Sequence, residues 1–371
     1  MGIFLKIERR NLVFLFFVVF IFTQISLIKA ENRNLNLYHV IALIYLVFIF
    51  IKVIFRKKII RINLYLILLF LMTSLLSFFL WNSPKSIVLI LFCLLYVVIG
   101  YDFSHIGSDA RKKIYNIAMW FFVISTVIRD LYHLGNLNVI YSYGNGGGWS
   151  LATGGPNIEA TIFAILGILY TGRYKFILGV IMTLSIILFE SRIGFIGASI
   201  FWFRYFTGRR RVFVILALII SSIIIFPNLE NIKILNRFSV KNEEKLGDDG
   251  LGRLALWKNA IRGIESNPLG IGPGNSVNYI NSHYGTSFWE NNIHNVFMTW
   301  IFELGWFIAL PVIFLFVYLI VNSWLKFHES QILLYIFVCC FVQFIGYDVL
   351  IWFFIGIIMG CIKNAKVKNC Y

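Results

Sequence analysis

The chain has 371 residues, of which 59% are hydrophobic and 18% aromatic, while only 13% are charged, and its mean hydropathy is +0.82. These values exclude an ordinary soluble domain and indicate a polytopic membrane protein. The net charge of +16 would also suit a nucleic-acid-binding protein, but membrane topology accounts for most of it, so we expect no nucleic-acid partner.

Apolar stretches that can form membrane helices recur along almost the whole chain. A bilayer core roughly 30 Å thick needs about 20 apolar residues per helix. Twelve segments are predicted, at residues 11–28, 38–55, 62–80, 86–100, 114–131, 158–171, 176–189, 193–206, 212–226, 296–321, 332–346 and 349–362. The three between residues 158 and 206 are nearer to 14 residues long, which suggests buried or re-entrant pieces. We expect an all-α fold, a polytopic membrane bundle of about 12 transmembrane helices.

The basic residues predict which loops face the cytoplasm. With both termini inside, the cytoplasmic segments hold 21 of the 33 Lys and Arg residues, the short outer segments hold five, and seven lie in one long outer loop. Long translocated loops escape the positive-inside rule. The first apolar segment is expected to be a membrane anchor, because its run of about 18 residues exceeds the apolar core of a cleaved signal.

This topology divides the chain into three parts. Residues 1–226 hold transmembrane helices 1–9, residues 227–295 form an extracytoplasmic loop with an amphipathic helix, and residues 296–371 hold helices 10–12 and a cytoplasmic tail. The five cysteines lie in predicted helices or in the tail. No disulfide framework or metal-ligand spacing follows from them.

Two of the outer segments that precede the long loop contain candidate binding residues. The sequence "YGNGGGWSLATGGPNIEAT" has glycines that allow tight turns and close approach to a ligand, or that make a flexible connector. Its Trp149 can anchor at the membrane interface or stack on a sugar ring. The sequence "FESRIGF" puts Arg192 at the outer surface, where it can bind phosphate, pair with Glu190 or reach lipid headgroups.

The long outer loop is predicted to contain a helix that begins at Arg253 and ends at Asn267 and Pro268. Spacings of three and four residues give this helix one apolar face, made by Leu254, Trp257, Ile261 and Ile264. The helix would lie along the outer membrane surface. Its cations fall away from the apolar stripe and can reach headgroups or a phosphate-bearing substrate; they are Arg253, Lys258 and Arg262. The following "PLGIGPGN" is predicted to be a glycine-rich turn.

A histidine stands where the loop meets the next apolar run, in "ENNIHNVFMTW". Burying a polar ring at a bilayer boundary costs free energy, so His294 is either hydrogen-bonded for structure or kept for chemistry. Asn295 follows it and is a candidate supporting residue. Glu303 lies inside the apolar run and is expected to hold a structural hydrogen bond rather than act as an acid.

These motifs resemble the O-antigen ligase and polysaccharide polymerase family. The pair "GRLALWKNAIRGIESNPLGIGPGN" and "NNIHNVFMTWIFELGW" is similar to that family's long periplasmic loop and following helix. The segments "FESRIGFIGAS" and "ATGGPNIEA" resemble its arginine-containing turn and its Gly/Asn turn. The resemblance covers about the last 60% of the chain, whereas the first 130 residues match only in being apolar helices.

The resemblance implies a glycosyltransferase of the bacterial inner (cytoplasmic) membrane, active in lipopolysaccharide or capsule synthesis. It would transfer a glycan from undecaprenyl diphosphate to an acceptor hydroxyl, with inversion and without metal or cofactor. His294 would take the acceptor's proton, and Arg192, Arg253 and Arg262 would bind the pyrophosphate. Further partners would be the acceptor glycan or lipid, membrane lipids and a chain-length regulator.

Three functions remain open at this stage. A polymerase would extend another lipid-linked glycan, and it is favoured because "YDVLIWFFIG" lacks an arginine expected in many ligases. A ligase would transfer the glycan to lipid A-core. A transporter or flippase also suits twelve helices, but the long loop lies outside after the ninth helix and no matching halves are visible.

Overall fold

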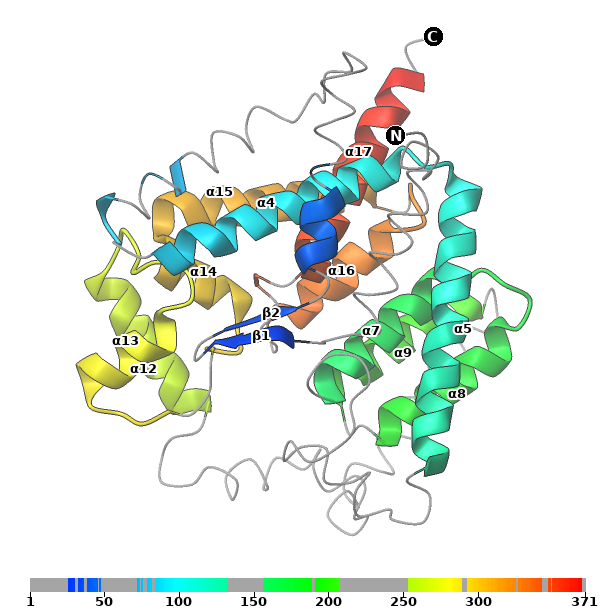
Figure 1. Ribbon diagram of the computed structural model, residues 1–371, viewed down its shortest axis with the longest axis horizontal. Helices are drawn as coiled ribbons and strands as arrows, with labels where there is room; N and C mark the ends of the chain where they lie inside the picture. Colours follow the sequence, from blue (N-terminus) through cyan, green and yellow to red (C-terminus); the bar gives the residue numbers. More distant parts are fainter. Residues whose placement is uncertain are drawn as a thin grey trace. The chain divides into compact units, whose positions relative to one another are not determined.

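The computed structural model describes residues 26–30, 33–36, 39–45, 47, 72–73, 75, 79–81, 84–132, 156–188, 191–206, 253–288, 292–324, 326–341, 346–347 and 349–368. Most of the first three predicted membrane segments, and all of the ninth, lie outside these residues. The described chain forms two compact units (Figure 1). Unit 1 comprises Met1–Val40 and Gly107–Leu246, and unit 2 comprises Ile41–Ile106 and Gly247–Tyr371.

The described residues of unit 1 form four main helices, and the three short segments predicted from sequence are present within two residues of their expected bounds. They are α7 (Pro156–Leu169), α8 (Lys175–Leu188) and α9 (Arg192–Tyr205), beside the longer α5 (Ser108–Tyr132). Each short helix has 14 residues and is therefore about 21 Å long, less than the bilayer core. Helix α7 packs between α5 and α9, and its residues from Ala160 to Leu169 are buried.

The all-helical expectation needs one correction in unit 1. Strands β1 (Ser26–Ala30) and β2 (Arg33–Asn36) form a two-stranded antiparallel sheet, with Ala30 paired to Arg33. The predicted first membrane helix, at residues 11–28, therefore cannot extend past residue 25. Only two residues separate the paired Ala30 and Arg33, which is a length typical of a β-hairpin connection. In the paired strands, backbone N–H and C=O groups bond to each other, whereas the last C=O groups of a helix ending here would have no partner within that helix.

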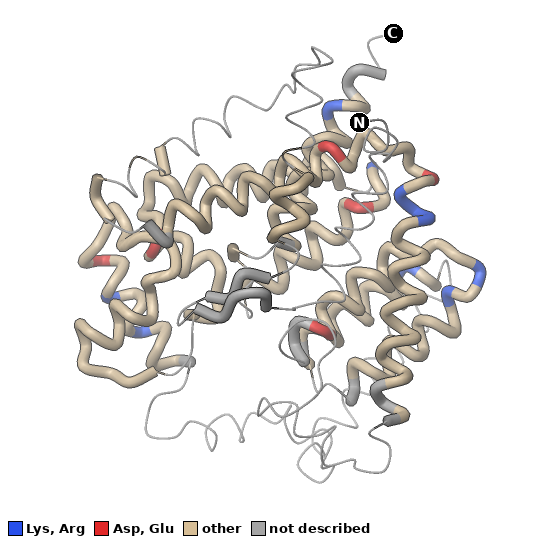
Figure 2. The backbone as a smooth tube through the Cα atoms, viewed as in Figure 1, with Lys and Arg blue, Asp and Glu red and all other residues tan. Residues whose placement is uncertain are grey.

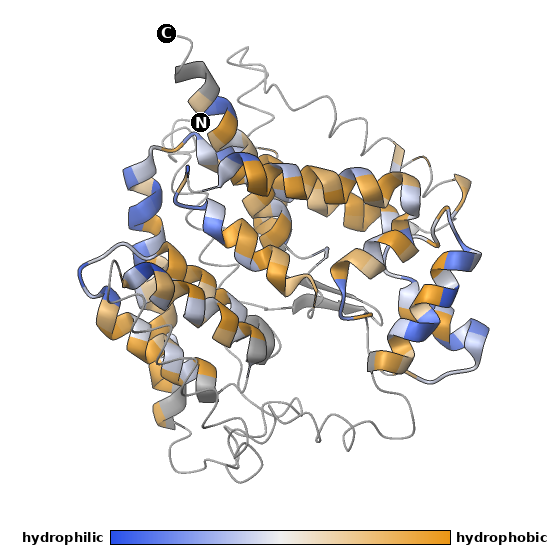
Figure 3. Ribbon diagram, turned by 180° about the vertical axis from the view of Figure 1, so that it is seen from behind, coloured by the Kyte–Doolittle hydropathy of each residue, from blue (hydrophilic) through white to orange (hydrophobic). Residues whose placement is uncertain are grey.

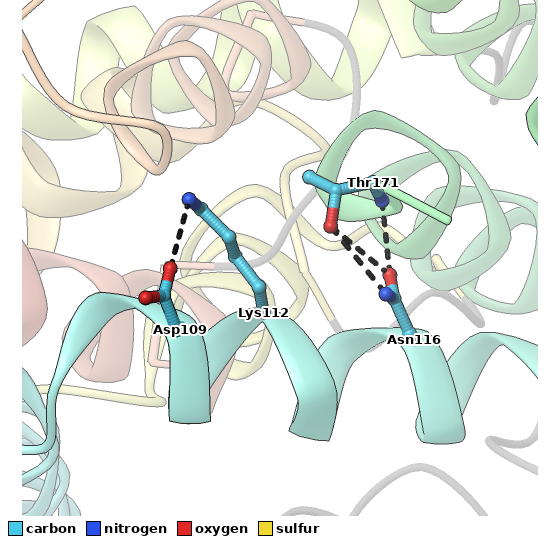
Figure 4. Close-up of polar contacts among 4 residues, drawn as sticks. All are labelled: Asp109, Lys112, Asn116 and Thr171. Carbon is cyan, nitrogen blue, oxygen red and sulfur yellow. Dashed lines mark hydrogen bonds and ion pairs between the residues drawn. The ribbon is translucent and has the colours of Figure 1, made fainter. Parts of the chain in front are cut away.

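Basic residues at the start of α5 and in the α7–α8 turn lie toward the same end of unit 1. The backbone N–H of Thr171, between α7 and α8, donates to the Asn116 side chain of α5 at 2.9 Å (Figure 4). This contact brings the first turns of α5, where Lys112 pairs with Asp109, beside the α7–α8 turn. Figure 2 shows the Lys and Arg of both segments toward the same end of the unit. The hairpin of α8 and α9 puts Arg192, the first residue of α9, at the opposite end from Lys175, the first residue of α8.

Unit 2 is organised around two crossing apolar helices, α4 (Pro84–Ser104) and α17 (Val349–Lys368). Glycines let their backbones approach closely, because a Cβ on Gly100 would overlap the carbonyl of Phe353, and one on Gly356 would overlap that of Val97. Helix α15 (Trp306–Ser323) and helix α16 (Ser330–Cys339) complete the apolar part of the unit. By length and composition, Ser86–Ser104 and Trp306–Ser323 are candidate membrane spans among the described helices (Figure 3).

The predicted tenth membrane helix, at residues 296–321, is broken into two. Helix α14 (Val296–Leu304) has nine residues and is followed by Gly305, whose φ is 74° and ψ is 166°. A side chain at Gly305 would overlap the backbone of Leu269. The break exists because the glycine-rich turn packs against it: Trp306 N–H donates to Pro268 O at 3.1 Å, and Ile271 N–H donates to Phe302 O at 3.2 Å. A continuous helix would leave no room for that turn.

The eleventh predicted helix, at residues 332–346, is also shorter than expected. Helix α16 ends at Cys339, because the next two carbonyls serve another element. Val296 N–H donates to Cys340 O at 2.8 Å, and the Asn295 amide donates to Phe341 O at 3.3 Å. The end of α16 thus fixes the start of α14.

The predicted amphipathic helix is present as α12 (Arg253–Ser266) and is followed by α13 (Ser276–Tyr284). A small apolar core joins these helices to α14; its buried members are Leu256, Ala260, Val277, Ile280, Phe288, Ile293 and Phe302. The predicted apolar stripe is only half right. Trp257 and Ile264 pack against the core, whereas Leu254 and Ile261 are 79% and 51% exposed. The helix is rotated because Gly263 lies against the ring of Phe302, where a side chain would not fit.

Candidate functional site

His294 has an unusual backbone conformation. Its φ is +59°, and it is the one non-glycine residue with positive φ in the described part of the chain. This region costs an L-residue roughly 1–2 kcal/mol, although histidine enters it more readily than most. The backbone N–H of His294 donates to the Asn292 side chain at 3.0 Å, and the imidazole is half-buried. Strain of this kind persists where surrounding contacts enforce it, and it is concentrated at functional sites.

The contacts that enforce this turn come from both sides. The indole N–H of Trp257 donates to the carbonyl of Ile293 at 2.8 Å, which ties α12 to the residue before His294. On the other side, Asn295 caps α14 by accepting from Met298 N–H at 3.0 Å. The Asn295 amide also reaches the end of α16. His294 therefore stands on a turn held by three separate helices.

Arg253 and Arg262 occupy different faces of α12. Arg253 begins the helix, four residues or about one turn before Trp257, and so lies on the side of the helix that meets the His294 turn. Arg262 follows nine residues later, which is about 13.5 Å farther along and on the opposite side of the helix. Its side chain is exposed. The structure therefore separates two arginines that the sequence had grouped together.

The glycine-rich turn holds the carboxylate of Glu303, whose side chain is only 2% exposed. Gly274 N–H donates to Glu303 at 2.7 Å, and Ser276 N–H, at the first residue of α13, donates to it at 3.1 Å. An anion is stabilised at a helix N-terminus by the free N–H groups and the helix dipole. The expected structural hydrogen bonds of Glu303 are therefore present. This turn is filled by the protein's own carboxylate.

Arg192 belongs to unit 1, whereas His294, Arg253, Arg262, Asn295 and Glu303 belong to unit 2. Arg192 is the first residue of α9, whose cap Ser191 accepts from Gly194 N–H at 3.3 Å. Gly194 packs tightly against Ala160, so the first turn of α9 is fixed against the first turn of α7. The expected partner Glu190 lies outside the described residues, as does Trp149.

Two residues of this site were missed from sequence. Trp257 was assigned to an apolar stripe, and its indole N–H, a polar group that usually finds a partner when buried, was the available signal. Asn292 gave no signal, because its role depends on the turn that His294 makes. No group of three His, Cys, Asp or Glu side chains gathers as metal ligands within the described ranges.

The segment at residues 177–313 matches the family model described as O-antigen ligase. This segment of the chain is similar to O-antigen ligases. The matched O-antigen ligase segment contains all six candidate residues, together with α12, the glycine-rich turn and the turn of His294. The resemblance to the O-antigen ligase and polymerase family is confirmed, and with it the general assignment to polysaccharide synthesis at a membrane. No curated protein matches the chain.

The match also limits what the resemblance covers. The Gly/Asn turn "ATGGPNIEA", at residues 152–160, lies before the matched O-antigen ligase segment. The whole of α7 also lies before the matched segment. It nevertheless packs directly on α8, which overlaps the start of the match, and on α9, which lies inside it. The matched segment therefore joins part of unit 1 to part of unit 2 along the sequence.

Proposed function

We propose that the protein transfers a glycan from an undecaprenyl-diphosphate-linked donor to a sugar hydroxyl of a second lipid-linked glycan, as a surface polysaccharide polymerase. The observation that carries this proposal is the strained turn of His294, which three helices hold inside an O-antigen ligase segment. A structural histidine would not need a left-handed backbone, whereas a group that must meet a substrate in one orientation benefits from it.

His294 is the general base of the proposed reaction. As the acceptor oxygen attacks the anomeric carbon, its proton passes to the imidazole, whose reference pKa of about 6.5 suits a base near neutral pH. The bond from the anomeric carbon to the diphosphate oxygen breaks, and the electron pair leaves with the diphosphate. Attack from the side opposite the diphosphate inverts the anomeric centre.

Arginines would balance the charge of the leaving diphosphate without a metal ion or cofactor. Guanidinium groups bind phosphate oxygens in a bidentate manner and stabilise charge that develops in the transition state. Arg253 is favoured by its position at the end of α12 nearest the His294 turn, and Arg192 by its place in the family-like outer turn. Arg262, on the opposite side of α12, is the least suited of the three and would instead meet lipid headgroups.

A second candidate is an O-antigen ligase, which would transfer the glycan to lipid A-core. The description of the matching family favours it. The lipid-linked donor and the general base would be the same as in the polymerase reaction, and only the acceptor would differ. Glycans of a deletion strain distinguish the two: single repeat units on the surface lipid indicate a lost polymerase, whereas long unattached chains indicate a lost ligase.

The direct test is glycan transfer by the purified protein in proteoliposomes that contain the lipid-linked donor. Activity that disappears in His294→Asn, while donor binding and folding persist, supports the proposal. Asparagine is the matched variant because it also tolerates the left-handed conformation but has no basic nitrogen. Movement of donor across the bilayer without new glycosidic bonds would identify a transporter and contradict the proposal.

A further inference from the structure

Two cations lie close together at the basic end of unit 1, where α8 begins and α9 ends. Lys175 is the first residue of α8, and Arg204 is in the last turn of α9. Both side chains are partly buried, and the Arg204 guanidinium is near enough to act on the Lys175 ammonium electrostatically. Like charges held together in a partly buried place destabilise the fold unless something compensates them.

Nothing in the described part of the chain supplies that compensation. One guanidinium nitrogen of Arg204, Nη1, is buried and has no hydrogen-bond partner among the described groups. No described carboxylate makes a salt bridge with either cation, and α8 has no acidic residue in its first turn. A buried donor without a partner costs roughly 1–3 kcal/mol, and more when it is charged. The two cations and the positive end of the α8 dipole thus share one unmet requirement, for an anion.

Aromatic rings surround the start of α8 and contact one of the two cations. The Lys175 ammonium lies 5.6 Å from the centre of the Phe201 ring. Phe176 packs against both Trp202 and Tyr205, with ring centres 5.7 Å and 5.8 Å apart. The Trp202 indole donates to the hydroxyl of Thr183 at 2.9 Å, which fixes this ring on α8. The Phe201 ring therefore orders Lys175 without neutralising it, and the half-exposed Phe176 offers an apolar border to the site.

We propose that Lys175 and Arg204 form a binding site for a phosphate-ester anion. Arginine presents a planar fork of donors that matches two phosphate oxygens, and lysine adds a compact positive charge. The apolar border and the predicted cytoplasmic location favour the headgroup of an anionic phospholipid as the source, because basic pockets between membrane helices on that side bind such headgroups. Free phosphate presents the same chemistry. This site is separate from the proposed transfer reaction, and Arg192 stands at the other end of the same hairpin.

The test uses the full-length protein in nanodiscs of phosphatidylcholine alone or with added phosphatidylglycerol. We expect phosphatidylglycerol to raise the melting temperature of the wild type, and Lys175→Gln and Arg204→Gln each to weaken this lipid's binding about five- to tenfold. Arg173→Gln is the matched control, because Arg173 lies at the same end but is exposed and rests over the ring of Tyr174, so it should keep the lipid response.

In nanodiscs of phosphatidylcholine alone, the two substitutions should change the stability of the protein in the opposite direction. With only zwitterionic lipid present and no lipid of net negative charge, replacing either cation relieves repulsion, so the variants should be at least as stable as the wild type. Retained lipid, counted by native mass spectrometry on the folded fraction, gives a second readout if a variant is poorly stable. Added inorganic phosphate in phosphatidylcholine identifies the source: a stabilisation equal to that by phosphatidylglycerol supports the site but assigns it to free phosphate. Equal lipid responses in the wild type and in both variants would overturn the proposal.

Discussion

Replacing His294 by glycine separates the chemical role of the side chain from its cost to the fold. Glycine adopts a φ of +59° without strain, which recovers part of the roughly 1–2 kcal/mol that the left-handed region costs an L-residue. The greater conformational freedom of glycine in the unfolded chain destabilises the folded state by about 0.5–1 kcal/mol, which offsets this gain. We therefore expect His294→Gly to remain within about 1 kcal/mol of the wild type in stability.

Alanine at the same position gives a contrasting result. It loses the imidazole but keeps the strain, so His294→Ala should be about 1 kcal/mol less stable than His294→Gly. Both variants should lose 10² to 10⁴ in turnover, about 2.7–5.4 kcal/mol in the activation barrier, if the imidazole is the general base.

Thermal unfolding in nanodiscs and glycan transfer per folded molecule in proteoliposomes measure the two effects on the same preparations. Donor binding, assayed separately, should be unchanged in both variants. An alanine variant as stable as the glycine variant would refute the strained backbone. Near wild-type turnover in either would refute the catalytic role, whatever the stability.

Four further outcomes are expected. Arg192→Lys and Arg253→Lys should each impair transfer, measured as turnover per folded molecule, because an ammonium cannot make the bidentate phosphate contact. Glu303→Gln should lower thermal stability by about 1–3 kcal/mol with little change in turnover, because the amide cannot accept from both backbone N–H groups that the carboxylate now satisfies. Gly356→Ala should destabilise the protein by about 1–3 kcal/mol, seen as a lower melting temperature, because its methyl would force α4 away from α17. Chelators should leave transfer unchanged in proteoliposomes, because arginines neutralise the diphosphate in the proposed mechanism.

Matched variants make these outcomes specific. Arg262→Lys should keep nearly normal turnover, since Arg262 is exposed on the far side of α12, and a loss as large as that of Arg253→Lys would return it to the pyrophosphate site. Gly107→Ala is the control for Gly356→Ala and should leave the melting temperature unchanged, because no atom lies within 4 Å of the added Cβ. Activity that disappears with a chelator and returns with a divalent cation would require a metal in the mechanism.

Local patterns in the sequence predicted much of this structure. The bounds of α12, and of the three short helices of unit 1, follow from apolar runs that end in charged or turn-forming residues, and such signals are local. The place of His294 just before a helix was visible for the same reason, since Asn295 is a good capping residue directly ahead of the apolar run.

The features that sequence did not reveal depend on contacts between distant residues. Gly305 stands in an unbroken apolar run, and only the turn packed against it explains the break between α14 and α15. The partners of Glu303 lie 27 and 29 residues earlier. Periodicity gave only half of the buried face of α12, because small residues, Ala260 and Gly263, mark its closest packing and contribute little to an apolar pattern. His294 was proposed on chemical grounds, but its backbone strain could be seen only in three dimensions.

The small core shared by α12, α13 and α14 has a consequence for the order in which the protein is made. Phe302, at the centre of that core, is synthesised after all the residues of α12 and α13 that pack against it. The loop helices are therefore synthesised before their packing partner, and their apolar faces stay uncovered until α14 has followed them. Domains generally acquire their structure as the chain emerges, at about 5–20 residues per second. The turn that carries His294 is consequently assembled only after α12 and α13 have been synthesised.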